Sequence, residues 1–270
     1  MPPNSPMDAV TRSYSDPVGS FRVDYRDAMR VLEIWRYPVK SLQGEMVDST
    51  QVGAEGIEGD RQLAIFDLAT GFGLTGRREA ALLFAAARLV EGAVVVTLPD
   101  GSLAEDDEAL SAWIGRPVAL RSTSEAESRR FESPEDFEHE ETSNWRAFTG
   151  ALGSFRDGQD AAISIASTGS LGLWPQRRFR PNLVVSDSGE DELVGSSLDI
   201  GDARITVRDR LGRCVMVTRA QPGIDRDLDV LRTVHRERDH TFAVGATIDR
   251  AGRIAVGDEL LAVKSSSRAS

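Results

Sequence analysis

Cysteine is the scarcest chemically useful residue in this chain: 270 residues contain only one, Cys214. A single cysteine cannot form an internal disulfide, so the fold is not stapled by disulfides, and we expect a cytoplasmic, reducing location. Histidine is almost as rare, since only His139, His235 and His240 occur. None of them stands at zinc-ligand spacing from Cys214, so the sequence offers no conventional zinc site.

Long apolar runs and an excess of positive charge are also missing. No stretch approaches the ~20 consecutive apolar residues that span a bilayer, so we expect no membrane association. Residues 1–27 are polar and rich in proline and serine, lack the apolar region of a signal peptide, and are expected to form a disordered arm. The net charge of −11 argues against nucleic-acid binding, which relies on basic surface. A local basic pocket for one small anion stays compatible with this charge.

Three common signatures of catalytic folds are absent as well. The chain has no G-x-x-x-x-G-K-[ST] loop and no G-x-G-x-x-G after a strand, so nucleotide-binding folds have no support. It also lacks the G-x-S-x-G elbow of the α/β-hydrolases. Apolar residues make up 40% of the chain, which is enough for a core. The 24 glycines and 11 prolines, set among short Val/Ile/Leu runs, predict a mainly β (α+β) fold with a few short helices.

The pattern of apolar and turn residues predicts many short strands. These are Ala28–Val39, Ser49–Val52, Arg61–Phe66, Gly73–Thr75, Ala93–Leu98, Ala161–Ala166, Asn182–Ser186, Ser197–Ile200, Ala203–Arg208, Val215–Thr218, Arg253–Val256 and Leu260–Val263. Helices are predicted at Asp106–Ile114 and Leu228–Arg236, and Ala80–Ala87 is compatible with either helix or strand. The acidic segment Ser124–Thr142 predicts a solvated linker or surface excursion, with a docking surface for a redox partner as the alternative.

Cys214 by itself is typical of a small, inert core residue. Three arginines precede it, Arg208, Arg210 and Arg213, and nearby cations stabilise a thiolate, the form that binds metals or attacks electrophiles. The apolar run Val215–Val217 is expected to anchor this loop as a strand. A papain-like pairing with a histidine stays open, because such pairs meet only in three dimensions. A soft thiolate is better suited to a metal that arrives already chelated by an organic cofactor.

An anionic cofactor needs cations and hydrogen-bond donors, and candidates recur at the ends of predicted strands. They are Lys40-Ser41, Asp60-Arg61, Thr75-Gly-Arg-Arg78 and Arg177-Arg-Phe-Arg-Pro-Asn182. Taken singly, each is more typical of a solvated charge at a strand end. Taken together with Cys214, they form a pattern.

Six short motifs, in their order along the chain, resemble the MOSC proteins. They are Tyr37-Pro-Val-Lys-Ser41, Gly59-Asp-Arg61, Thr75-Gly-Arg77, Phe179-Arg-Pro-Asn182, Gly212-Arg-Cys214 and Gly252-Arg-Ile-Ala-Val-Gly-Asp258. The similarity is to the branch that includes the mitochondrial amidoxime-reducing component and its bacterial relatives. It implies an N-terminal MOSC-type β-barrel domain at 28–122, an acidic linker or excursion at 123–145, a MOSC β-barrel domain at 146–264 and a frayed tail at 265–270.

The resemblance also implies a molybdenum–molybdopterin cofactor lodged between the two domains. Cys214 would bind the molybdenum, and Arg77 would line the pocket near the metal as a second catalytic residue. The pterin and its phosphate would be held by Lys40, Ser41 and Arg61 from the first domain and by Ser167, Thr168, Arg180, Asn182 and Arg213 from the second.

The implied activity is the two-electron reduction of small N-oxygenated substrates, such as N-hydroxylated amidines and hydroxylamines. One cysteine cannot ligate an iron–sulfur cluster, which needs about four, so a separate flavin- or ferredoxin-type protein would supply the electrons. We expect a monomer without the membrane anchor of the mitochondrial members. The alternative function is a non-catalytic carrier that binds sulfur or molybdopterin on Cys214 and delivers it to other enzymes. The MOSC domains of cofactor sulfurases resemble this role, but a full sulfurase needs a pyridoxal-phosphate domain, for which 270 residues leave no room.

Overall fold

The computed structural model describes residues 29–158, 161–187 and 189–263. The arm expected at 1–27 and the tail expected at 265–270 lie outside the described residues. Strands dominate and only three α-helices occur in the described part of the chain, which confirms the mainly β prediction. None of its helices combines the length and the apolar character needed to cross a membrane.

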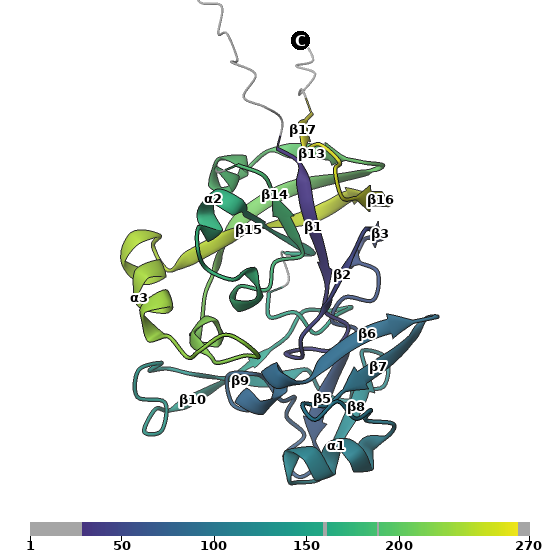
Figure 1. Ribbon diagram of the computed structural model, residues 1–270, viewed down its shortest axis with the longest axis vertical. Coiled ribbons are helices and arrows are strands. Elements are labelled where there is room, and N and C mark those ends of the chain that lie inside the picture. Colours follow the sequence, from purple (N-terminus) through teal and green to yellow (C-terminus); the bar gives the residue numbers. More distant parts are fainter. Residues whose placement is uncertain (1–28, 159–160, 188, 264–270) are drawn as a thin grey trace, which may run out of the picture.

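An eight-stranded sheet forms the upper part of the molecule (Figure 1). Its order is β17 (Leu261–Ala262), β13 (Ser197–Ile200), β14 (Ala203–Gly212), β15 (Thr241–Arg250), β11 (Ile163–Ser167), β12 (Leu183–Val185), β1 (Val31–Arg36) and β2 (Glu45–Val47). The strands β1 and β2 come from the N-terminal part of the chain but complete a sheet built otherwise from the C-terminal part. In Figure 1 the purple β1 therefore lies among green and yellow strands.

Alternation of buried and exposed side chains explains the long strands of this sheet. In β14, Ala203, Ile205 and Val207 are fully buried, whereas the residues between them are partly exposed. Side chains that alternate in this way point to opposite faces of a sheet, and the buried face here packs into the largest core cluster. Val31 and Ile34 of β1 belong to the same cluster, so the first strand is part of the core of the C-terminal half.

The lower part of the molecule contains shorter pieces of sheet around a second core cluster (Figure 1). The pairs are β5 (Leu63–Asp67) with β8 (Val118–Ser122) and β6 (Ala86–Val90) with β7 (Ala93–Thr97). A three-stranded sheet of β16 (Gly252–Ala255), β3 (Ser49–Gly53) and β4 (Gly56–Ile57) belongs to the upper part instead, since Val52, Ile57 and Ile254 pack into the first cluster. The helix α1 (Asp107–Ile114) begins at Asp106, whose carboxylate accepts the backbone N–H of Ala109. It ends at Gly115, which takes the left-handed conformation favoured by glycine.

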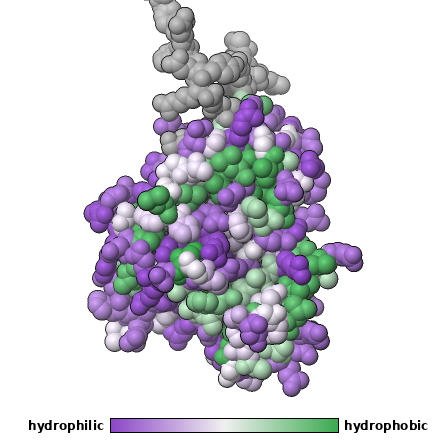
Figure 2. Space-filling model, in the orientation of Figure 1, coloured by the Kyte–Doolittle hydropathy of each residue, from purple (hydrophilic) through white to green (hydrophobic). Residues whose placement is uncertain are grey.

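The acidic segment Ser124–Thr142, predicted as a solvated linker or surface excursion, contains the first strand and the loop of a hairpin. Its strands are β9 (Arg130–Pro134) and β10 (Trp145–Thr149), and its loop reaches the helix α3 (Leu228–Glu237) of the C-terminal half. Phe137 packs against the ring of His235, and Glu138 forms an ion pair with Arg232. Hydrophilic side chains cover this region of the surface, whereas apolar ones gather over β1 (Figure 2).

Some predicted elements differ in the structure. Gly73–Thr75 is not a strand, because only Gly73 forms an isolated bridge, to Phe66. Val215–Thr218 is the 3₁₀ helix η4 rather than a strand, since Val217 N–H and Thr218 Oγ1 turn back onto Cys214 O and Val215 O. The ambiguous Ala80–Ala87 divides into the 3₁₀ helix η1 (Ala80–Phe84) and the start of β6. The remaining short helices are α2 (Thr168–Leu171), η2 (Gln176–Arg178) and η3 (Glu190–Leu193).

Candidate functional site

A cavity of about 350 Å³ lies where the two halves of the chain meet. Seven cationic side chains and one carboxylate from the described residues line it, although the chain as a whole carries a net charge of −11. The cations are Lys40, Arg61, Arg77, Arg156, Arg178, Arg180 and Arg213, and the carboxylate is Asp157. Ser41, Asn182 and Cys214 also line the cavity. The structure therefore gathers eight of the ten residues predicted for the site.

Two of the sequence motifs are fixed against each other by Asp60. Its carboxylate accepts the backbone N–H of Tyr37 at 2.9 Å and the Nη1 of Arg61 at 2.6 Å. The Arg61 N–H donates to Tyr37 O at 2.7 Å. Gly59 has a φ of +77°, and a Cβ there would lie 2.3 Å from Leu89. The Gly-Asp-Arg turn therefore requires its glycine, and it sets the Arg61 side chain beside the Tyr37 ring.

Two arginines of the cavity pack against the buried ring of Tyr37. The guanidinium carbons of Arg61 and Arg180 lie 4.7 Å and 4.2 Å from its centroid. The hydroxyl donates to Pro181 O at 3.2 Å, and Arg61 Nη2 donates to Arg180 O at 3.2 Å. Burial raises the pKa of Tyr37 to about 12, despite the opposing charges of the two arginines, so the ring is neutral and cation–π contact holds both side chains.

Three site residues adopt a left-handed backbone that L-residues rarely use. The φ angles are +68° at Ser41, +52° at Arg61 and +55° at Arg180. The Ser41 hydroxyl accepts the backbone N–H of Gly76 at 3.0 Å, which joins two of the sequence motifs. Strained backbone of this kind persists where the surroundings over-determine it, and it clusters at functional sites.

Cys214 stands at the start of η4 with its side chain partly exposed to the cavity. Arg77 Nε donates to its Sγ at 3.2 Å. The neighbouring Arg213 is held by carbonyl oxygens, with Nε to Phe242 O at 2.7 Å and Nη1 to Phe179 O at 3.3 Å. The thiol thus faces a guanidinium that comes from the other half of the chain.

Asp157 belongs to the site but no sequence pattern marked it. Its carboxylate accepts from Lys40 Nζ at 2.5 Å and forms an ion pair with Arg77. Burial would raise the pKa of Asp157, but the charges of Arg77 and Lys40 outweigh it and hold the pKa well below its usual range. Burial also lowers the pKa of Lys40, which Asp157 partly offsets. The side chain of Asp157 is 46% exposed, while those of Lys40 and Arg77 are 7% and 6% exposed. The carboxylate therefore lies on the solvent side of both cations.

Several donors of the cavity arginines have no partner among the described residues. These buried, unpaired nitrogens are Nη1 of Arg77, Nη2 of Arg180, and Nε and Nη1 of Arg156. A buried donor without an acceptor costs about 1–3 kcal/mol, and more when it is charged. No three histidine, cysteine or carboxylate side chains in the described ranges lie together as ligands for a bare metal ion. One thiol, unpaired guanidinium donors and a large excess of positive charge fit an anionic cofactor that brings its metal already chelated.

Two predicted binding residues do not line this cavity. The Ser167 hydroxyl is fully buried and donates to Glu190 Oε2 at 2.5 Å, and it also accepts the backbone N–H of Ser170 at the start of α2. Thr168 is exposed and donates to Asp187 O at 3.3 Å. Neither side chain is therefore placed to bind a ligand in this cavity.

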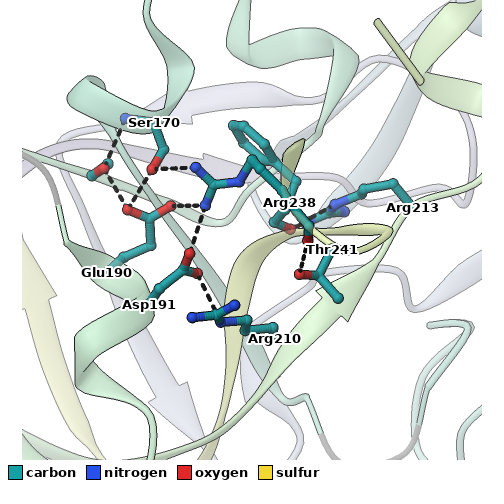
Figure 3. A network of polar contacts seen from close by, with 9 residues as sticks. Ser170, Glu190, Asp191, Arg210, Arg213, Arg238 and Thr241 are labelled. Carbon is teal, nitrogen blue, oxygen red and sulfur yellow. Dashed lines mark hydrogen bonds and ion pairs between the residues drawn. The ribbon is translucent and has the colours of Figure 1, made fainter. Parts of the chain in front are cut away.

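Glu190 is the centre of the polar network that Ser167 joins (Figure 3). It is fully buried and accepts from Ser170 Oγ at 2.8 Å, while Arg238 donates to both Ser170 and Asp191. The Arg238 guanidinium lies 4.9 Å from the ring centroid of Phe242, whose carbonyl accepts from Arg213. Through Phe242, the network is thus connected to Arg213 in the cavity wall.

The loop between β9 and β10 is also connected to the cavity, through Arg219 and Arg77. Glu140 forms a largely buried ion pair with Arg219, and the same guanidinium donates to the carbonyl of Arg77. The ring of Phe148 lies 5.1 Å from the Arg77 guanidinium carbon. The acidic segment is thus connected to the residue that contacts Cys214.

Comparison with protein families gives two adjoining matches. The MOSC N-terminal beta barrel domain matches residues 28–145, and the MOSC domain matches residues 153–261. The chain belongs to the MOSC-domain family. The first match includes the acidic segment Ser124–Thr142 and ends at Trp145, the first residue of β10. The second match begins just before Arg156 and Asp157.

Solved structures similar to this MOSC protein are distant in sequence. The YuaD protein from Bacillus subtilis is 11% identical, with a TM-score of 0.41 over 86% of this chain and 94% of that chain. YiiM from Geobacillus stearothermophilus is 18% identical, with a TM-score of 0.33 over 51% and 73% of the two chains. A comparison with curated protein sequences gave no match.

Proposed function

We propose that this MOSC protein is a molybdenum-cofactor-dependent oxidoreductase that reduces small N-oxygenated, for example N-hydroxylated, substrates. The MOSC family is linked with the molybdenum cofactor, and the cavity supplies what such a cofactor needs. One observation carries the proposal: the single thiol of the chain contacts Arg77 inside a cavity with seven cations and one carboxylate among the described residues. A structural cysteine in an apolar core has no need of such surroundings.

The cavity residues predicted from the sequence have specific tasks in this proposal. Cys214 would provide one thiolate to the metal, and Lys40, Ser41, Arg61, Arg180, Asn182 and Arg213 would bind and orient the anionic organic part. When bound, the cofactor supplies a two-electron change between Mo(IV) and Mo(VI), which allows an oxygen atom to leave nitrogen. The protein's own contribution is an open, preorganised site with fixed charges.

Arg77 is the second residue assigned to the chemistry. The charges of Asp157 and Cys214 outweigh the effect of burial and raise the pKa of Arg77 further, so the guanidinium stays protonated. Its Nε is directed at Cys214 Sγ, and its Nη1 meets no acceptor in the described part of the chain. A fixed cation at this position would stabilise negative charge that develops on the departing oxygen.

The electrons must come from outside the 270 residues, because one cysteine cannot hold an iron–sulfur cluster. We propose a separate flavin- or ferredoxin-type donor protein and a monomeric enzyme in the cytoplasm.

Metal analysis after expression in a host that makes molybdopterin tests the proposal. We expect about one molybdenum per chain, as a single thiolate ligand implies, and reduction of an N-hydroxylated amidine with an artificial electron donor. Cys214→Ser should lose both. Unchanged metal content and activity in Cys214→Ser would contradict the proposal. A persulfide on Cys214 without molybdenum would instead favour the carrier function.

A further inference from the structure

We infer that Arg156 is a further anion-binding residue of the cavity, and that it holds a phosphate monoester beside Arg61. No motif of the sequence marks this arginine. The inference rests on the proposed function only in taking the phosphate to be that of the bound cofactor.

The position of Arg156 is fixed by its neighbours in the chain. Phe155 is fully buried in the aromatic cluster with Phe66 and Phe131, and its backbone N–H donates to Arg61 O at 2.8 Å. The carbonyl of Arg156 accepts the backbone N–H of Ala151 at 2.9 Å. The backbone that carries this guanidinium is thus anchored to the segment that carries Arg61.

Among the described cations of the cavity, Arg156 has the most buried nitrogens without a hydrogen-bond partner. It is 9% exposed, and its Nε and Nη1 are buried without a partner in residues 29–158, 161–187 and 189–263. Its nearest carboxylate, Glu55, lies 3.9 Å from Nη2 and is 59% exposed, which makes this a weak contact. Arg178, an equally buried arginine of the cavity, differs because it donates to the carbonyls of Val217, Arg219 and Asp225.

A ligand with several acceptor oxygens would provide the hydrogen-bond partners that Arg156 lacks. Arg61 already uses Nη1 on Asp60 and Nη2 on the carbonyl of Arg180, so it offers mainly charge. Within the described residues, Nε and Nη1 of Arg156 and Nη2 of Arg180 are buried and have no acceptor. Burial lowers the pKa of Arg156, with Asp60 partly offsetting it, so a nearby dianion would also relieve an electrostatic cost. Guanidinium groups that converge in this way are typical of phosphate recognition.

Phosphate binding to the protein purified without molybdenum tests the inference. The probes are inorganic phosphate and phenyl phosphate, a small monoester, titrated by calorimetry. Arg156→Gln should weaken both by roughly tenfold or more, since a hydrogen bond to a charged group contributes that much. Arg156→Lys should be intermediate, because it keeps the charge but loses the fork of donors. The matched control is Arg146→Gln, whose side chain is 78% exposed and should leave binding unchanged.

Pterin content after expression with the cofactor separates the two sources of phosphate. Loss of both phosphate affinity and pterin content in Arg156→Gln supports a role on the cofactor's phosphate. Loss of phosphate affinity with normal pterin content would overturn that role and assign the site to free phosphate. Equal phosphate affinity in Arg156→Gln and the wild type would overturn the whole inference, whether or not the wild type carries molybdenum.

Denaturation in phosphate-free buffer distinguishes binding from a structural role. An unpaired buried cation does not stabilise the fold, so Arg156→Met should unfold at an unchanged or higher urea concentration. A clear decrease would show that Arg156 serves the fold instead.

Discussion

Two clusters of buried charge lie close together in this protein, and they differ in the balance between positive and negative side chains. In the cavity, seven cations face a single carboxylate of the described chain. Unpaired buried nitrogens occur in both clusters, since Nε of Arg238 also has no partner among the described residues, so the two clusters differ in net charge. Around Glu190, the buried carboxylate meets Ser167, Ser170 and Arg238, and Asp191 provides a second anion (Figure 3). Evolution leaves buried charge unbalanced only where something else completes it. Balance therefore separates the structural cluster from the binding cluster.

The largest effect is expected from breaking the balanced cluster. Glu190→Ala would leave the Arg238 guanidinium without its buried carboxylate and two serine hydroxyls without an acceptor. We expect a loss of about 3–5 kcal/mol in the free energy of unfolding, the usual cost of removing one partner of a buried pair. Urea denaturation measures it. The control is Glu192→Ala in the same short helix, where the side chain is exposed. Equal losses in the two variants would refute the distinction.

A much smaller effect on stability is expected from a substitution in the cavity. Burial lowers the pKa of Arg180 to about 10, with the neighbouring Arg61 also lowering it and Tyr37 opposing. Arg180→Met should change the stability of the cofactor-free protein by less than about 1 kcal/mol, because the lost cation–π contact is offset by relief of an unpaired buried charge. The free energy of phosphate binding should become less favourable by roughly 1.5–3 kcal/mol.

Arg178→Met provides the matched comparison for Arg180→Met. Arg178 is equally buried, but all its observed donors meet carbonyls. Its replacement should cost about 1–3 kcal/mol of stability by leaving those carbonyls unpaired. If Arg180→Met destabilised the protein as much as Arg178→Met, unpaired donors would not identify binding residues.

The pH dependence tests the carboxylate of Asp157 in the cavity. The pKa of Asp157 is depressed in the folded protein, so its stabilising contribution is present above its unfolded pKa of about 3.9 and is lost as the pH falls through the lower folded value. Because the side chain is nearly half exposed, we expect no more than about 1 kcal/mol. Asp157→Asn should therefore lose less stability than the wild type between about pH 5 and pH 2. Parallel curves would contradict this assignment.

The smallest effect should come from a pair that is balanced but exposed. Glu138 and Arg232 are 37% and 46% exposed, and their ion pair connects the acidic hairpin to α3. Glu138→Gln should cost about 0.2–1 kcal/mol at low salt and almost nothing at about 1 M salt, where the Debye length is roughly 3 Å. A larger, salt-independent loss would mean that pairing matters more than burial.

Apolar alternation was sufficient to predict most strands and both longer helices from the sequence. It failed in the acidic segment, where the charged residues around Phe131 hide a hairpin whose buried positions are few. It failed again after Cys214. The four residues Val215–Thr218 are apolar or β-branched and therefore predict a strand, but they form a 3₁₀ helix whose hydrogen bonds to preceding carbonyls leave no mark in the sequence.

The motifs located most of the site but not its counter-charges. Lys40, Arg61, Arg180 and Arg213 converge as the resemblance implied. Asp157 and Arg156 could not be predicted, because a single acidic or basic residue in a loop is typical of a solvated surface. Ser167 and Thr168 do not line the cavity. The Ser167 hydroxyl donates instead to the buried carboxylate of Glu190, which lies 23 residues further along the chain and could not be identified as its partner from the sequence.

The place of β1 in the sheet also sets the order of events during synthesis. Ile34 pairs with Leu183, so the strand leaves the ribosome about 150 residues before its partner exists. At roughly 5–20 residues per second, that interval is about 8–30 s. During this time β1 has only the short strand β2 beside it and lacks both β12 and the core that its apolar side chains enter. The nascent chain therefore presents a natural target for chaperones, and a truncated chain that begins after β1 would expose the edge of β12 to aggregation.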